Sequence, residues 1–98
     1  MSSERDRFEK VLRSNFSLKG ADGATTDLEL AEVSALRERP HQTSFSLVFL
    51  TQPSVTAEQG LYDLHHETLG EVQVFLVPIG IVDERMKLEA VFNSLRED

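Results

Sequence analysis

Apolar and polar residues recur with two different periods along this chain. Within residues 3–13, Phe8, Val11 and Leu12 fall on one narrow stripe of a helix, and a serine that can cap the helix begins the segment. The spacing predicts a short N-terminal helix that lies against the rest of the domain. From residue 15 onward the period changes to two, which is typical of a β-strand with one buried face.

The first two expected strands form a hairpin. Alternation around Phe16 and Leu18 predicts a short strand, and residues 20–23 supply the Asp-Gly chemistry of a tight turn. The return segment, Thr26 to Val33, begins with strand-like alternation, but its Leu, Glu and Ala residues also favour an amphipathic helix. We favour a strand with a bulge near Ala31-Glu32, because a hairpin turn directly precedes it.

Polar loops separate the later strands. Residues 37–42 are expected to form a polar loop, and residues 52–60 a second loop with room for one helical turn. Pro78 and Gly80 are expected to end a strand, since proline cannot donate a hydrogen bond to a sheet. The last residues, 94–98, form a polar tail. The strands expected after the first hairpin are 45–50, 61–66, 72–77 and 87–92.

About six short strands joined by hairpin-sized loops indicate a mainly β fold. The expected architecture is a small antiparallel six-stranded barrel or a tight sandwich with one N-terminal helix, and the pattern leaves both open. A chain of 98 residues allows one domain, 1–98, with the helix at 3–13, antiparallel β structure at 14–93 and the tail at 94–98.

Composition and charge exclude several classes of function. The chain has no cysteine, so neither a disulfide framework nor a thiolate metal site can form. Its formal net charge of -7 repels nucleic acids and anionic membranes. The longest apolar stretch, Val74 to Val82, is far shorter than the ~20 residues of a membrane-spanning helix. The first residues lack the apolar region of a signal peptide, so we expect a cytoplasmic protein.

The second half of the chain contains three motifs, Tyr62-x-Leu64-x-His66-x-x-Leu69-Gly70, Phe75-Leu76-Val77-Pro78-Ile79-Gly80 and Glu89-Ala90-Val91-Phe92-Asn93. These motifs resemble an uncharacterised family of short bacterial β proteins, whose members often lie near phage-tail-collar-like proteins. The first half matches more loosely. Family members often carry an aromatic residue at the position of Leu88. The family offers no catalytic or cofactor-binding residues, and the resemblance implies a structural or accessory role in a phage-tail-like assembly.

Two adjacent histidines are the first candidates for chemistry. His65 and His66 lie in an expected strand, so their side chains leave opposite faces and cannot bind one metal together. His66 shares a face with Tyr62, and we expect it to enter the core and bond a backbone carbonyl or a carboxylate. His65 shares a face with Asp63, which predicts an exposed pair. His41, in a loop, is expected to be exposed.

No set of residues typical of catalysis or metal binding is visible. A metal site needs three or four converging ligands, whereas Asp83-Glu84 is a charged loop tip, and Asp27 and Glu29 lie on the wet face of a strand. The chain has no nucleophile elbow, phosphate loop or dinucleotide fingerprint. We therefore predict no catalytic, cofactor-binding or metal site and a protein that is not an enzyme.

Two expected strands are apolar on both faces, and such strands must be covered on both sides. The N-terminal helix can cover one patch, and any remaining apolar area is a contact surface for a partner protein or a second copy. The predicted surface comprises Val48, Leu50, Phe75, Val77, Ile79 and Ile81.

Three hypotheses follow for function. The leading one is a non-enzymatic structural or protein-interaction module, accessory to a phage-tail-like assembly. The alternative is an acidic inhibitor or immunity-type protein that masks a basic partner, since a charge of -7 speeds capture of such a partner. A small-molecule carrier is the third hypothesis. It ranks last because the protein's own side chains are expected to fill so small a barrel and leave little room for a ligand.

Overall fold

One short helix and seven strands make up residues 4–19 and 25–95, the parts of the chain that the computed structural model describes. The expected cap at residue 3, the turn at 20–23 and the end of the tail at 96–98 lie outside the described residues. The elements are α1 (Glu4–Glu9), β1 (Asn15–Lys19), β2 (Thr25–Val33), β3 (Arg37–Arg39), β4 (Gln42–Leu50), β5 (Gly60–His66), β6 (Gly70–Val82) and β7 (Arg85–Leu95).

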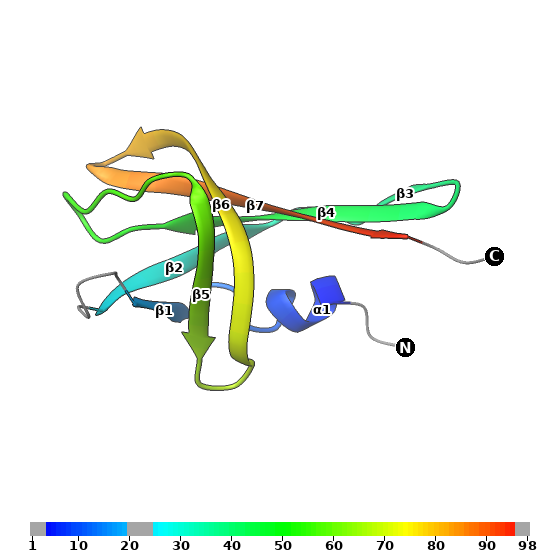
Figure 1. Ribbon diagram of the computed structural model, residues 1–98, viewed down its shortest axis with the longest axis horizontal. Helices are drawn as coiled ribbons and strands as arrows, with labels where there is room; N and C mark the ends of the chain where they lie inside the picture. The colour runs from blue at the N-terminus through cyan, green and yellow to red at the C-terminus, as the bar shows by residue number, and fades with distance from the viewer. Residues whose placement is uncertain (1–3, 20–24, 96–98) are drawn as a thin grey trace.

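Six of these strands close into an antiparallel barrel (Figure 1). Their order is β2-β1-β5-β6-β7-β4, and pairing of β2 with β4 closes the ring. The mainly β prediction is confirmed, and of the two architectures left open the protein adopts the barrel. The seventh strand, β3, pairs only with β4, outside the ring.

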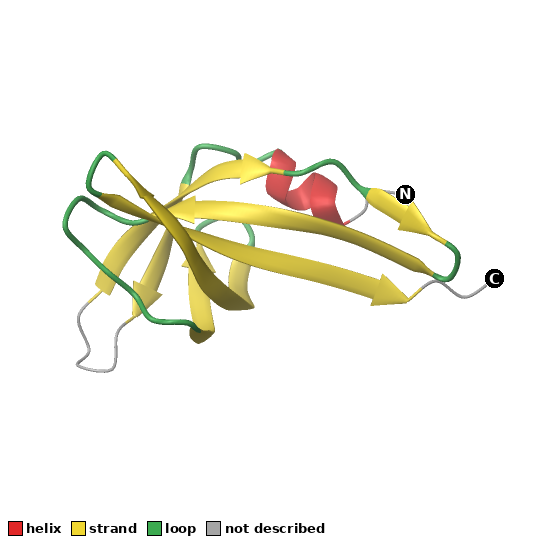
Figure 2. Cartoon of the chain, turned by 90° about the horizontal axis from the view of Figure 1, so that it is seen from above, coloured by secondary structure: helices red, strands yellow, loops and turns green. Residues whose placement is uncertain are grey.

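A three-stranded ribbon extends from one side of the barrel (Figure 2). It consists of β3, residues 42–46 of β4 and residues 91–95 of β7, and we call it the arm. Because of the arm the molecule is elongated, measuring 44 × 26 × 22 Å. The prediction of a polar loop at 37–42 is wrong, because these residues form the hairpin between β3 and β4. The three charged residues of β3 are exposed on both faces, so no alternation marks them as a strand.

The helix is shorter than the predicted span of 3–13. After the bond from the Lys10 amide to the Asp6 carbonyl, the following amides bond three residues back, and Arg13 has a positive φ of 75°. The Arg13 amide then donates to the Leu30 carbonyl of β2, 2.8 Å away, so pairing with the sheet replaces the next helical turn. Phe8 anchors α1, since its buried ring contacts the rings of three other phenylalanines, Phe16, Phe45 and Phe92.

The strand interpretation of the second segment is confirmed. β2 runs from Thr25 to Val33, and its register with β4 shifts between Leu30 and Glu32, where the bulge was predicted. At a bulge two residues of one strand oppose a single residue of its neighbour, and this bends the bulged strand. The bend lets β2 pair with β1 in its first part and with β4 in its second.

The predicted end of β6 at Pro78 is wrong. The strand continues to Val82, and its register with β7 shifts between Pro78 and Gly80, which leaves Ile79 as the extra residue of a bulge. A bulge disrupts the local ladder, so a proline without an N–H is accommodated there. β7 likewise runs beyond 92 to Leu95, and the loop after β4 contains a hydrogen-bonded turn but no helix.

Candidate functional site

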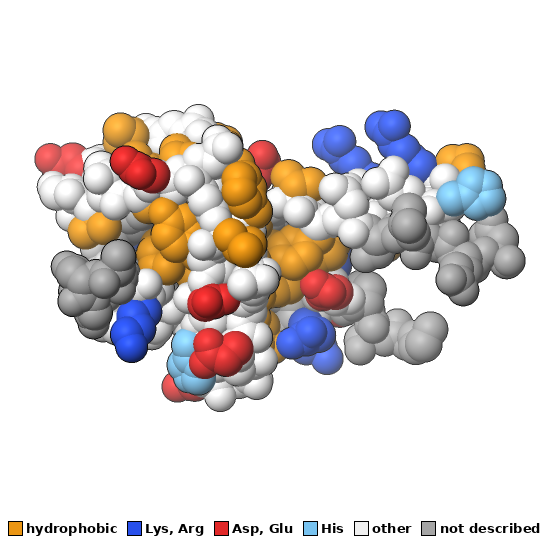
Figure 3. Space-filling view, viewed as in Figure 1, with side chains coloured by type: hydrophobic (Ala, Val, Ile, Leu, Met, Phe, Trp, Pro, Cys, Tyr) orange, Lys and Arg blue, Asp and Glu red, His pale blue; other side chains and the backbone are white. Residues whose placement is uncertain are grey.

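Exposed apolar side chains gather on β5, β6 and β7. Eight large apolar residues are exposed within residues 4–19 and 25–93, and six of them lie on these strands. Leu61 of β5 stands opposite Phe75 of β6, and their side chains are 62% and 49% exposed. Apolar atoms are visible over this part of the molecule in Figure 3. We call the six residues the apolar surface: Leu61, Phe75, Ile79, Ile81, Val82 and Val91.

The structure divides the six residues predicted to form a contact surface. Exposed residues among them are Phe75, Ile79 and Ile81. Val77 and Leu50 are half-buried. Val48 is only 8% exposed, so its predicted place on the contact surface is wrong. Val48 is covered because β4 lies between β2 and β7, where Glu32 and Glu89 flank it in register. The stems of long charged side chains often cover apolar neighbours in this way.

Sequence reasoning missed three members of the apolar surface. The exposure of Leu61 follows from its register opposite Phe75, which the sequence alone does not give. Val82 lies at the end of the unexpectedly long β6, and Val91 is exposed where β7 enters the arm. Alternation within the last motif placed Val91 on the face opposite the buried Ala90, and this was the one available signal.

His66 lies inside the barrel, as predicted, and it is 4% exposed. Its ring packs against Phe16, with the ring centroids 4.6 Å apart. The predicted bond to a carbonyl or carboxylate is wrong. The turn after β5 instead directs two amides at the ring, so Nδ1 accepts from the Thr68 and Leu69 N–H groups at 3.0 and 3.2 Å.

The second ring nitrogen joins His66 to the segment before β1. Because Nδ1 accepts, the neutral ring carries its proton on Nε2, which lies 2.9 Å from Ser14 Oγ. Ser14 Oγ donates in turn to the Val11 carbonyl oxygen. With Nε2 as the donor, His66 cannot accept the serine proton, so this contact is a structural link between segments and not a nucleophile paired with a base.

The other histidines are at the surface. The side chain of His65 leaves the opposite face of β5, as predicted. The predicted pairing with Asp63 is wrong, because His65 Nδ1 lies 2.8 Å from a carboxylate oxygen of Glu71 on β6. Asp63 accepts instead from Gln73, 3.1 Å away. Both contacts join β5 to β6, because cross-strand neighbours are closer than residues two apart on one strand. His41 is exposed in the turn between β3 and β4.

The two carboxylates predicted on one wet face of β2 have different surroundings. Asp27 is exposed, whereas Glu29 is half-buried and contacts two arginines, Arg85 at 3.0 Å and Arg13 at 3.6 Å. Residues 83–84 form the tight turn between β6 and β7, and both have positive φ. Within the described ranges, no group of three or more metal-ligating side chains converges.

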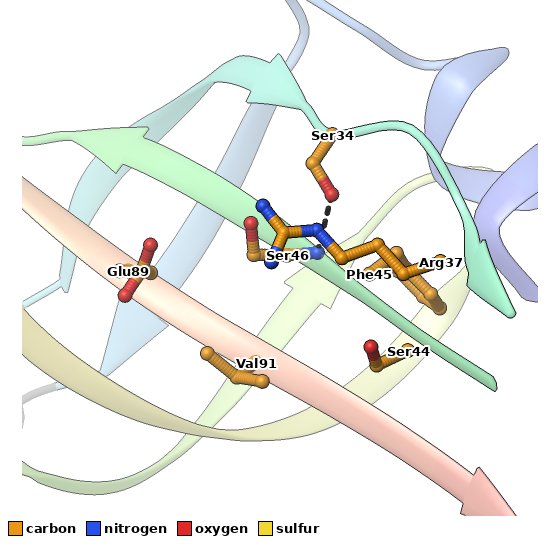
Figure 4. A pocket seen from close by; sticks show the side chains of 7 residues that line it. All are labelled: Ser34, Arg37, Ser44, Phe45, Ser46, Glu89 and Val91. Carbon is orange, nitrogen blue, oxygen red and sulfur yellow. Dashed lines mark hydrogen bonds between the residues drawn. The ribbon is translucent and has the colours of Figure 1, made fainter. Parts of the chain in front are cut away.

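Three hollows open onto the surface. Two lie along β1 and β5, which share only two registered residue pairs, and they measure about 320 and 480 Å³. The third, about 180 Å³, lies where the arm leaves the barrel (Figure 4). In it the Arg37 side chain crosses above Ser46, whose amide donates to Ser34 Oγ at 2.8 Å, and Glu89 and Val91 line the floor from β7.

The fold and these surfaces define a small antiparallel β-barrel domain with exposed apolar side chains on three neighbouring strands. The chain belongs to the family described as "Domain of unknown function (DUF6916)", whose model matches residues 3–92. This agrees with the expected uncharacterised family. Comparisons with curated proteins and with solved structures found no match. In the described part of the chain, no helix is long and apolar enough to cross a membrane.

Proposed function

We propose that this chain is a non-enzymatic interaction module that binds another protein through the apolar surface. The proposal is carried by the position of six of the eight exposed large apolar side chains of the described residues on β5, β6 and β7. Single exposed apolar residues are ordinary on protein surfaces, whereas several on neighbouring strands, with Leu61 registered opposite Phe75, are typical of a site of contact.

The composition of the apolar surface supports a contact of this kind. Phe75 and Leu61 form a cross-strand pair, and polar residues flank them on the same faces, including the bonded pair Asp63 and Gln73. An apolar centre with a polar rim is the usual anatomy of a protein interface. Burying one such side chain is worth about 1.5–3 kcal/mol, so two or three together supply a large part of a binding energy.

Among the residues that the structure describes, no nucleophile is paired with a base, and this supports the non-enzymatic part of the proposal. The closest pairing of a hydroxyl with an imidazole, Ser14 with His66, holds the histidine in the tautomer that donates to the serine. The family resemblance supports the finer proposal, a role as an accessory to a phage-tail-like assembly. The partner to test first is accordingly a phage-tail-collar-like protein encoded nearby.

The experiment is affinity capture from the native host with the wild-type chain and two variants. Leu61→Ser with Phe75→Ser removes the centre of the apolar surface, and Leu36→Ser makes the same change at an exposed leucine elsewhere. We expect the wild type and Leu36→Ser to retain the same protein, and the double variant to retain about tenfold less or lower. Equal retention by all three chains would refute the proposal.

The alternative, an acidic inhibitor that masks a basic protein, is favoured by the net charge of -7. Electrostatic steering makes association fast at low salt and much slower at high salt. An apolar contact responds little to salt. Measuring the association rate of the captured partner between low and high ionic strength therefore separates the two proposals.

A further inference from the structure

One carboxylate lies within the outer apolar face of the barrel. The residues before and after Glu89 on β7 are buried, so its side chain leaves the outer face of the strand. In register, Glu89 lies between Val77 of β6 and Val48 of β4. Val91, two residues further along β7 on the same face, is 59% exposed. Glu89 is therefore a half-buried charge with apolar neighbours on three sides.

Glu89 is continuous with the apolar surface. Phe75 lies two residues before Val77 on the outer face of β6, and Leu61 of β5 is registered opposite Phe75. Val77 in turn is registered opposite Glu89, and Val91 is the next residue of β7 on this face. A partner protein that covers Phe75 and Val91 therefore also removes water from the carboxylate of Glu89.

No cation among the described residues is bonded to this carboxylate. Lys87, two residues before Glu89 on the same face, lies 3.9 Å from a carboxylate oxygen of Glu32 instead. Arg37 lines the same hollow as Glu89 (Figure 4), but no ion pair or hydrogen bond joins the two. Because Glu89 is only half-buried, water solvates it in the free protein. A partner that removes this water without supplying a positive charge leaves an unpaired carboxylate, which costs binding energy.

The hollow at the base of the arm gives a cation room beside Glu89. It measures about 180 Å³ and opens onto the surface. Glu89 and Val91 line its floor, and Ser44 and Ser46 of β4 contribute hydroxyl groups (Figure 4). A Lys or Arg side chain matches this lining, because its charged end can meet the carboxylate and hydroxyl oxygens while its alkyl stem lies on the valine.

The other charges of this face indicate that the occupant is a different protein and not a second copy of this chain. Within residues 60–77 and 87–91, the outward positions carry Asp63, Glu71 and Glu89. They carry one lysine, Lys87, which already contacts Glu32. A second copy would set these carboxylates against one another, whereas a protein that presents a basic group complements them.

We propose that the partner of the apolar surface is a protein that presents a Lys or Arg among apolar side chains, and that this cation pairs with Glu89. The inference rests on the proposed function, and it names the chemistry of the partner at one point of the contact. A single pair of this kind responds to salt far less than steering by the whole net charge of -7, so the salt dependence of association still separates the two proposals above.

The test uses the full chain labelled with ¹⁵N and three blocked peptides, acetyl-Leu-Arg-Leu-amide and the same peptide with citrulline or Glu in place of Arg. Citrulline keeps the shape of Arg but carries no charge. We expect the Arg peptide to shift the amide resonances of residues 75–77 and 89–91 and to bind about fivefold more tightly than the citrulline peptide. The Glu peptide should bind more weakly still, because it brings a like charge to Glu89.

Variants of the chain locate the charge that the peptides sense. In Glu89→Gln the Arg and citrulline peptides should bind equally, because the pair that distinguishes them is gone. Glu67→Gln removes the same charge from the exposed turn between β5 and β6, and it should keep the fivefold preference for Arg. Since Glu89 has no bonding partner among the described residues, Glu89→Gln should unfold at the same urea concentration as the wild type.

Three results would overturn the inference: no shift at residues 75–77 and 89–91, equal binding of the Arg and citrulline peptides by the wild type, or a preference for the Glu peptide, which would assign the hollow to an anion at Arg37. Failure of the proposed function gives a different result, equal capture of the native partner by the wild type and by Leu61→Ser with Phe75→Ser. If capture depends on Leu61 and Phe75 but is unchanged in Glu89→Gln, the inference fails and the proposed function stands.

Discussion

At the scale of single residues, the two buried polar side chains of the described chain, His66 and Thr51, each satisfy several backbone groups. For His66→Ala we expect a loss of about 2–4 kcal/mol in unfolding free energy, because two amides and Ser14 lose their partner and a cavity remains. The matched change, His65→Ala, removes an exposed pair with Glu71 and should cost less than about 1 kcal/mol. Urea unfolding of both variants checks this, and equal losses would contradict it.

Thr51 joins the end of β4 to the start of β7. Its hydroxyl accepts from the Met86 amide at 2.9 Å and lies 2.9 Å from the Val55 carbonyl oxygen, to which it donates. Thr51→Val keeps the shape but leaves both backbone groups unsatisfied, so we expect a loss of about 1–3 kcal/mol. Thr56→Val, at an exposed position, should change stability by no more than about 0.5 kcal/mol in the same urea titration. A similar effect of both changes would count against this role.

Strand alternation predicts from which face of a strand a side chain leaves, but not which groups the side chain bonds. Alternation placed His66 inside and His65 outside, and both placements are correct. The bonding partners were not predictable, because the turn at residues 67–69 supplies the amides for one ring and the neighbouring strand supplies Glu71 for the other. The importance of Thr51 was invisible in the sequence, since a threonine after a strand is common and its contact with the Met86 amide depends on β7, a strand distant in the sequence.

At the scale of elements, α1 has six residues, too few for a stable helix in isolation, so its place depends on packing. We expect Phe8→Ala to lower the unfolding free energy by about 3–5 kcal/mol and to release α1 from the barrel, because Phe8 is buried and contacts three other aromatic rings. Leu12→Ala, at a residue 40% exposed, is the control and should cost about 0.5 kcal/mol or less. Urea unfolding and the amide resonances of α1 report both effects. If α1 stays on the barrel in Phe8→Ala, its place does not depend on the packing of Phe8.

Element types were more predictable than element ends. The bulge in β2 was predictable because a break in alternation marks it directly, between Leu30 and Glu32. Pro78 was expected to end β6, but the bulge at Ile79 accommodates it, and this depends on the register with β7. β3 escaped prediction because its three charged residues show no buried face. The sequence predicted only some members of the apolar surface, because the exposure of a strand residue depends on which strands lie beside it.

At the scale of the whole molecule, the barrel is closed by unequal seams. β4 and β7 share nine registered pairs, whereas β1 and β5 share two, Ser17 with His65 and Leu18 with Leu64. Two surface hollows lie beside this short seam. The hydrogen bond from His66 to Ser14 crosses it, joining the end of β5 to the segment that leads into β1. His66 therefore holds the barrel closed where the backbone pairing is weakest.

This unequal closure predicts how the barrel opens under native conditions. Amides between β1 and β5 should exchange with solvent at least about tenfold faster than those between β4 and β7, because local opening there breaks few hydrogen bonds. His66→Ala should widen the difference, whereas Thr51→Val, which loosens the junction of β4 with β7, should narrow it. Hydrogen exchange followed by NMR measures all three chains. If the amides of both seams exchange at one common rate set by global unfolding, then the barrel opens as a single unit and His66 has no special role in its closure.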